Sequence, residues 1–374
     1  MQRPDQPYTG KQATKMEKLT ESGAIPSLDG LRAISILIVL VSHSGYGNVV
    51  PGGFGVTVFF FLSGYLITTL LLDEQQRNGS ISIWKFYLRR AFRLFPPLLV
   101  TLTIAYLLVA VGWLSGGVSW AGIAAQLLYF ANYYGLFFDP GNTTATGTGI
   151  LWSLAVEEHF YMVYPAALAG LIALGLSKHR IAIVLALVCV VVLAWRIYLA
   201  MQPHFVAQRT YYGSDTRVDS IIFGCLLAIV ADPKIDKRRT LNPLLTPTPA
   251  ALLAIAIFTL VMSIAWRDAF FRETLRYTLQ GLALMPIFYF SIKYAAYFPF
   301  NLLNHPWVAK IGVYSYAIYL IHHIVINAFH ENLPWLVDRK PLLILATFGI
   351  ATLYALLLDL YVDSFFRRLR TKFR

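Results

Sequence analysis

The chain has 374 residues, of which 57% are hydrophobic and only 13% are charged. Soluble proteins carry about 25% charged residues, so a chain this apolar could not cover its surface in water, and a water-soluble globule is excluded. The same composition excludes disorder, and the presence of only two cysteines excludes a disulfide scaffold. The mean hydropathy of +0.59 indicates a polytopic membrane protein, and the net charge of +12 requires an explanation.

Membrane-spanning helices are predicted wherever about 20 mostly apolar residues follow one another. Residues 1–24 are polar, so we expect no cleavable signal peptide there. The stretch 119–138 is long enough to cross a membrane but is ambiguous. We predict an all-α, polytopic transmembrane bundle of about ten spans, at residues 31–47, 52–72, 96–114, 151–174, 181–201, 217–232, 248–266, 275–296, 311–330 and 341–363.

Basic residues decide the orientation, because cytoplasmic loops carry an excess of Lys and Arg. If 119–138 does not cross and the N-terminus is cytoplasmic, most of the 31 basic residues fall on the cytoplasmic side. If 119–138 crosses, the basic clusters at 178–180 and 234–239 move to the disfavoured side. We therefore predict that both termini are cytoplasmic and that 119–138 is a re-entrant or interfacial segment facing outward.

Ionisable side chains at membrane depth are costly, so each one is a candidate for function. Arg32 and His43 lie in the first predicted span, and their spacing places both on one face of a helix, about 16 Å apart along its axis. A cation at the cytoplasmic mouth suits an anionic ligand, and a neutral imidazole suits proton abstraction. The alternative is a snorkelling arginine and a histidine that bonds to a neighbouring helix.

A basic amphipathic helix is predicted at residues 84–97, WKFYLRRAFRLFPP. Arg90 and Arg93 are three positions apart and share a face of that helix. Paired guanidinium groups can hold a phosphate by bidentate hydrogen bonds. The alternative is an anchor on anionic lipid.

The fourth predicted span opens with LWSLAVEEHFYMVYP, residues 151–165, and carries Glu157 and Glu158. A carboxylate inside a membrane is a candidate catalytic or electrostatic group. The run Glu-Glu-His lacks helical spacing for metal ligands, so we expect no metal site. Trp152 and Tyr161 in the same segment are candidates for stacking on a ligand.

Two further groupings are candidates for substrate contact. Asp215, Arg217 and Asp219 cluster at the outer start of the sixth span, where a local ion-pair network is an equal alternative. Tyr319 and His322 are three positions apart in the ninth span, where such a pair is more often a contact between helices.

These segments resemble the acyltransferase 3 family of bacterial inner-membrane proteins. Arg32 and His43 fit the family's Arg-x10-His pattern, and Arg90 and Arg93 fit its Arg-x-x-Arg pattern. The resemblance covers residues 27–330, in family order, through the segments LDGLRAISILIVLVSH, FFFLSGYLITTLLL, RRAFRLFP, LWSLAVEEHFYMVYP, RVDSIIFG and SYAIYLIHH.

The resemblance implies a multi-pass protein of the bacterial inner membrane that moves an acyl group, acetyl above all, from cytoplasmic acyl-CoA to a sugar hydroxyl. The acceptor would be a glycan or glycolipid such as O-antigen, an exopolysaccharide or a macrolide glycoside, and we expect contact with membrane lipid but no nucleic-acid partner. We divide the chain into a cytoplasmic tail at 1–26, a transmembrane domain at 27–366 and a basic tail at 367–374. An SGNH domain, which some members carry, is expected to be absent.

The resemblance also implies roles for the candidate residues. Arg90, Arg93 and Arg32 would hold the phosphates of acetyl-CoA, and His43 would act as general base on the sugar hydroxyl. Transfer through an acetyl group on His43 itself is the alternative. Glu158 or Glu157 would orient His43, and the remaining candidates would contact the acceptor: Trp152, Tyr161, Asp215, Arg217, Asp219, Tyr319 and His322.

A different class of function would use the same buried groups. A glycan-lipid transporter or flippase could use buried His and Glu as a proton relay. Transporters commonly carry inverted repeats with matching broken helices, and we find none in the sequence.

Overall fold

The computed structural model describes residues 25–139, 141, 143–233 and 247–371. Residues 1–24 of the predicted N-terminal tail, the basic cluster at 234–239 and the last three residues of the chain lie outside the described residues. The described chain is a helical membrane bundle, and its only β-type pairing is an isolated bridge between Gly116 and Ala145.

Seven helices in the described part of the chain are long and apolar enough to cross a membrane. Each corresponds to one of the predicted spans, and the last continues without a break from α16 into α17. The seven comprise α2 Leu28–Val41 with its π-helical end Ser42–Tyr46, α3 Gly52–Asn78, α4 Ile83–Ala110, α8 Lys178–Ala200, α11 Pro247–Ala265, α14 Pro306–Asn332 and the run of α16 Lys340–Leu358, Asp359–Asp363 and α17 Ser364–Thr371.

The other three predicted spans fall on helices that are shorter or more polar. α10, Ser214–Val230, has 17 residues and is buried along most of its length. α7, Leu151–Ala173, carries two carboxylates, and α13, Leu275–Lys293, has 19 residues. Because their polar groups are covered by neighbouring helices instead of lipid, these helices can be less apolar than the outer ones.

Residues 119–138 fold as two short helices, α5 Trp120–Leu127 and α6 Ala131–Phe137. Eight helical residues span about 12 Å, so neither helix can cross a bilayer. Asn132 of α6 donates to the Tyr212 carbonyl and to Ser214, which anchors this segment beside α9, Ala207–Tyr212. The segment is thereby held against the bundle as a non-spanning element.

Two close helix pairs hold the centre of the bundle, and both depend on glycine. A Cβ added at Gly64 of α3 would lie 1.9 Å from the Ile221 carbonyl oxygen of α10, so the two backbones touch there. A Cβ added at Gly312 of α14 would lie 1.8 Å from the Asp29 carbonyl oxygen of α2. Small residues allow such close crossings in membrane proteins.

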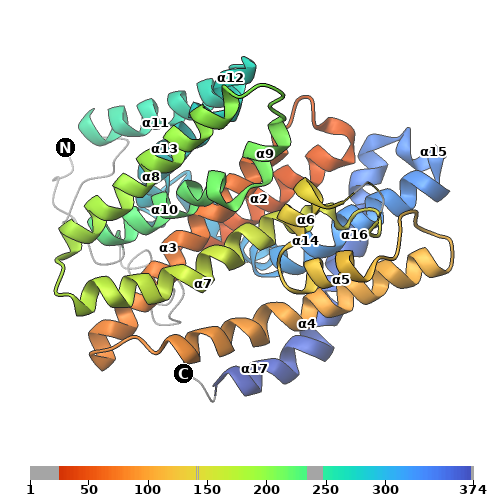
Figure 1. Ribbon diagram of the computed structural model, residues 1–374, viewed down its shortest axis with the longest axis horizontal. Helices are drawn as coiled ribbons and strands as arrows, with labels where there is room; N and C mark the ends of the chain where they lie inside the picture. The colour runs from red at the N-terminus through yellow and green to blue at the C-terminus, as the bar shows by residue number, and fades with distance from the viewer. Residues whose placement is uncertain (1–24, 140, 142, 234–246, 372–374) are drawn as a thin grey trace, which may run out of the picture.

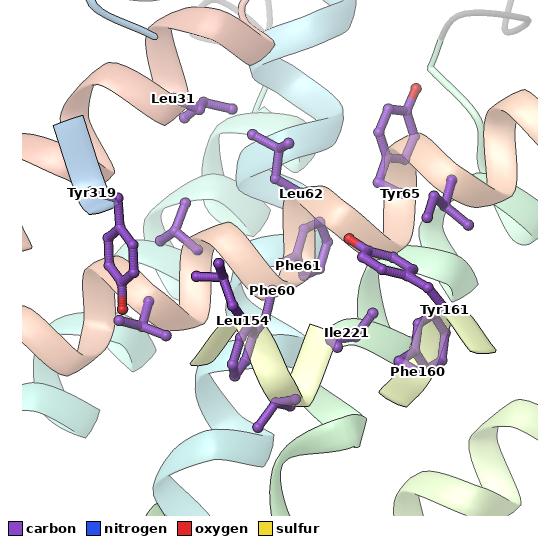
Figure 2. Packing of buried hydrophobic residues seen from close by; sticks show 14 of the residues in the cluster. Leu31, Phe60, Phe61, Leu62, Tyr65, Leu154, Phe160, Tyr161, Ile221 and Tyr319 are labelled. Atoms are coloured by element: carbon purple, nitrogen blue, oxygen red, sulfur yellow. The ribbon is translucent and has the colours of Figure 1, made fainter. Parts of the chain in front are cut away.

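A single large apolar core joins these helices. Figure 2 shows some of its side chains: Leu31 of α2, Phe60, Phe61, Leu62 and Tyr65 of α3, Leu154, Phe160 and Tyr161 of α7, Ile221 of α10 and Tyr319 of α14. In Figure 1, α11, the short α12 (Ala269–Glu273) and α13 lie along one edge of the view, and α4 with α17 lies along the opposite edge.

The outward faces of the outer helices are apolar. Val191 of α8 is 65% exposed, Phe258 of α11 is 65% exposed and Leu345 of α16 is 67% exposed. Soluble monomers rarely leave apolar faces of this extent uncovered, whereas lipid covers them without cost. Several charged and polar side chains lie inside the bundle instead, among them Arg196, Arg217 and Asp219.

Candidate active site

The first candidate residue, His43, lies in the π-helical turn Ser42–Tyr46 that ends α2. The chain leaves helical geometry directly after it, and Gly45 has a φ of 94°, a conformation that favours glycine. Short π-helical turns often occur at functional sites because they change the direction in which a side chain points. The turn directs His43 toward α14.

His43 meets two histidines of α14. Its Nδ1 lies 2.9 Å from His322 Nε2, and the two rings are stacked with an interplanar angle of 6°. The ring of His323 is 4.7 Å away between centroids and is tilted by 47°. α2 and α14 run in the same direction, because Asp29 contacts Gly312 near their starts and His43 contacts His322 further along.

The hydrogen bonds of His322 fix the tautomers of this pair when both rings are neutral. His322 Nδ1 lies 2.7 Å from the Tyr319 carbonyl oxygen, which can only accept, so this nitrogen carries the hydrogen. His322 Nε2 must then accept, and His43 Nδ1 must donate to it. The Nε2 of His43 is left with its lone pair and has no hydrogen-bond partner in the described part of the chain.

The two glutamates lie deeper in the bundle and do not contact His43. Tyr319 donates to the Ile150 carbonyl, which places the start of α7 one turn from the histidines. Glu157 and Glu158 follow a further two turns along α7, about 10 Å away at 1.5 Å per residue. The expectation that Glu158 or Glu157 orients His43 does not match this geometry, and His322 occupies that position instead.

Glu158 is instead the partner of Arg90. The Arg90 Nη2 lies 3.2 Å from Glu158 Oε1, and its guanidinium carbon lies 3.3 Å from the centroid of the Tyr161 ring. Glu157 accepts a hydrogen bond of 3.0 Å from Ser63 of α3. The sequence predicted these groups for different roles, and the structure brings Arg90, Glu158 and Tyr161 into one cluster.

This cluster borders a cavity of about 440 Å³ beside α4. Most of the lining is apolar or aromatic and comes from α4, with Phe366 contributed by α17 and Tyr129 by the 119–138 segment. Burial raises the pKa of Tyr129, so its hydroxyl stays protonated and can donate. Arg90 and Glu158 are the charged residues of the lining among those that the structure describes.

The three arginines that the sequence predicted as phosphate ligands do not lie together. Arg32 pairs with Asp29 at 2.6 Å near the start of α2 and does not line the cavity that Arg90 borders. Arg93 lies one turn beyond Arg90 on α4 and is likewise outside that lining. Of the three predicted phosphate ligands, Arg90 is the one that reaches the cavity.

Asp215, Arg217 and Asp219 go to three separate environments and form no ion pair with one another. Asp215 pairs with Arg209 and accepts from Trp195 Nε1 at 2.6 Å. Asp219 forms a fully buried pair with Arg196 of α8 at 2.7 Å. Arg196 is the single arginine inside the predicted span 181–201 and was the sequence signal for this partner, but the sequence did not identify the carboxylate that it pairs with.

Arg217 is fully buried among aromatic rings. Its guanidinium carbon lies 4.0 Å from the Tyr277 centroid, and Nη2 donates to Thr57. Trp152, which is 7% exposed, packs against Tyr211 with ring centroids 4.9 Å apart. Trp152 and Tyr161, predicted to stack on a sugar, are both buried in protein contacts.

No group of three or more His, Cys, Asp or Glu side chains in the described part of the chain is arranged to hold a metal ion.

Comparison with known proteins identifies the family of the chain. Residues 25–360 match the family described as acyltransferase domain. The chain belongs to the acyltransferase 3 family.

Two bacterial proteins are similar to the chain over most of its length. The chain is 30% identical over 318 residues to the peptidoglycan O-acetyltransferase OatA of Listeria monocytogenes. The matched region covers 81% of the chain and 49% of OatA. The chain is 32% identical over 312 residues to YrhL of Bacillus subtilis, covering 81% of the chain and 48% of YrhL. The chain thus spans about half the length of these relatives. No solved structure matches it.

Proposed function

We propose that this protein is a membrane O-acetyltransferase that moves an acetyl group from cytoplasmic acetyl-CoA to a hydroxyl of a cell-wall glycan, in a bundle of ten spans with both termini inside. The observation that carries the proposal is the His43 Nε2 lone pair, held in place by the contact between His43 and His322. The glycan acceptor is supported by OatA, which is named for O-acetylation of peptidoglycan.

In this reaction His43 Nε2 removes the proton from the acceptor hydroxyl. The oxygen attacks the thioester carbonyl, the carbon–sulfur bond breaks, and the protonated His43 returns the proton to the CoA thiolate. His322 accepts from His43 Nδ1 throughout, and so stabilises the imidazolium that forms after proton removal. Atoms and charge balance without a metal or a redox partner.

The cavity beside α4 supports a donor site. Its apolar and aromatic lining suits the thin pantetheine arm, and Arg90, fixed by Glu158 and Tyr161, offers a cation inside it. We assign Arg93 and Arg32 to the same cytoplasmic side, where they favour approach of the CoA phosphates. On this assignment Glu158 acts by positioning Arg90.

The test measures transfer of labelled acetyl from acetyl-CoA to cell-wall oligosaccharides by the purified full chain in lipid nanodiscs. His43→Ala should lower kcat at least about 100-fold, because general base catalysis contributes at least that factor. Near wild-type turnover of this variant would refute the base assignment.

His322 provides a matched pair of variants. In His322→Gln the amide oxygen can still accept from His43 Nδ1, whereas in His322→Leu it cannot. We therefore expect the glutamine variant to retain most of the kcat that the leucine variant loses. Equal loss in both, with unchanged thermal stability, would remove His322 from the positioning role.

A further inference from the structure

A second cavity, of about 370 Å³, lies at the other end of the bundle. It is formed where α2 ends and α3 begins, and it is closed by α9, by the segment 264–273 and by the start of α13. α3 alone has 27 residues, which is about 40 Å, so this cavity is far from the cytoplasmic start of α4, where the donor cavity lies. None of the residues assigned above to donor or catalysis lines it.

The lining of this cavity carries excess positive charge. Three arginines, Arg267, Arg272 and Arg276, contribute to it, and Glu273 is the acidic member among the described residues. Glu273 is already engaged, since it accepts from Thr210 at 2.8 Å and lies 4.0 Å from Arg276. The guanidinium of Arg272 contacts no carboxylate in the described part of the chain.

Two polar groups in or beside this cavity have unused hydrogen-bonding capacity. Gln280 is 3% exposed and lines the cavity, yet its amide makes no hydrogen bond with the described residues. Arg276 donates from Nη2 to the Tyr277 hydroxyl at 2.9 Å, but its buried Nε has no partner. Buried polar groups are almost always paired, so free donors around a cavity indicate a ligand that accepts from them.

A buried cation behind the cavity wall adds to the positive electrostatic potential of the cavity. Arg217 is fully buried and has no carboxylate partner among the described residues, and its guanidinium lies against Tyr277, whose ring lines the cavity. Its Nε is also unpaired. Positive charge concentrated around a recess attracts an anion and favours its binding.

One lining residue of this cavity is the chain neighbour of His43. Ser42 lines it and directly precedes His43, so the two Cα atoms are about 3.8 Å apart. Tyr211 packs closely over Gly53 within the cavity wall, because a Cβ added at Gly53 would meet the Tyr211 hydroxyl at 2.7 Å. A molecule bound beside Ser42 therefore lies close to His43, at the end of the bundle opposite the donor cavity.

We propose that this cavity holds an anionic group of the acceptor, a carboxylate or a phosphate, through Arg272, Arg276 and Gln280, and so presents a neighbouring sugar hydroxyl to His43. The acceptor is then a charged glycan, and the arginines select it over a neutral one. This inference rests on the proposed function, which supplies the acceptor, but it concerns binding and can be tested without turnover.

The experiment measures binding of fluorescent amino-sugar oligosaccharides to the full chain in nanodiscs by anisotropy. The first oligosaccharide carries lactyl carboxylates, and the second has the same carboxylates converted to amides. In the third, the sugars are neutral and the only anion is the polyprenyl diphosphate to which they are linked. We expect a charged form to bind at least about ten-fold more tightly than the amide, because a charge-assisted hydrogen bond contributes enough free energy for that factor. The first and third probes distinguish a carboxylate from a diphosphate as the anion.

The variants decide which residues are responsible. Arg272→Gln and Arg276→Gln should each reduce the preference for the charged form to near unity, while Arg272→Lys should retain part of it. Arg339→Gln is the control, since Arg339 is exposed, contacts Trp335 and lies outside the cavity. Equal binding of charged and amide forms, no binding of any form, or a preference that survives both glutamine variants would overturn the proposal. A preference without acetyl transfer to any probe would instead contradict the proposed function.

Discussion

Two arginine–carboxylate pairs of the described bundle, Arg196–Asp219 and Arg90–Glu158, have the same chemistry but different surroundings. Arg196 and Asp219 are both fully buried, 2.7 Å apart, between α8 and α10. Arg90 and Glu158 are 3.2 Å apart, retain 20% and 14% side-chain exposure, and border a cavity. The first pair is sealed by protein and the second is open to a ligand.

The number of satisfied hydrogen bonds explains the difference. Arg196 donates to the Thr274 and Thr216 carbonyls and to Thr278 as well as to Asp219. Arg90 donates to Glu158 alone among its hydrogen bonds to described residues, and its flat face lies on Tyr161. A cation that protein groups satisfy on all sides is structural, whereas one with unused donors beside a cavity can bind a substrate.

The strongest test of this comparison removes the sealed cation. Arg196→Met should destabilise the bundle by about 3–5 kcal/mol, because Asp219 is left as an unpaired charge without access to water. Thermal unfolding in detergent measures the loss. The double variant Arg196→Met with Asp219→Leu should recover most of it, and a single variant that melts like wild type would show that the pair is not sealed.

Removing Arg90, the cation beside the cavity, should affect the KM for acetyl-CoA more than the thermal stability. Arg90→Met should change the thermal stability less than Arg196→Met does, since Glu158 retains exposure at the cavity. The KM for acetyl-CoA should rise about ten-fold, the value of one lost charge-assisted contact. Steady-state kinetics at fixed acceptor measures this, and an unchanged KM would contradict the donor site.

The smallest change removes one hydroxyl beside the sealed pair. Thr278→Val removes the hydroxyl that accepts from Arg196 Nη2 at 2.6 Å and donates to Asp219 at 3.3 Å, and it leaves both charged residues in place. The expected loss of stability is about 1–2 kcal/mol, because each hydrogen bond has a net value of about 1 kcal/mol, and the KM for acetyl-CoA should not change. A shift in KM would connect the sealed pair to the donor site after all.

Local sequence patterns predicted the positions of the long helices correctly. Apolar runs gave the long helices because a bilayer imposes a minimum length of apolar chain, and the ambiguity of 119–138 corresponds to two short helices. The family pattern drew attention to His43 and Arg90. Glu158 was identified as a buried carboxylate, but its partner was not.

Partners were harder to predict because they depend on how helices cross. The α2–α14 contact at Gly312 aligns His43 with His322, whereas Glu158 of α7 pairs with Arg90, a contact that the sequence did not predict. The second cavity is another example. Arg272, Arg276 and Gln280 belong to no motif, and they come together with Ser42 only through the packing of α13 and its preceding loop against α2.

The sequence by itself determined that this is a membrane bundle with an excess of positive charge and a histidine in its first predicted span. Composition and apolar length decide those properties locally, residue by residue. Only the tertiary structure decided which charges are sealed, which are open and which ring holds His43 in place, because each of these depends on contacts between residues far apart in the chain. The net charge of +12 thus includes the sealed Arg196, Arg90 at the cavity beside α4 and the three arginines around the second cavity.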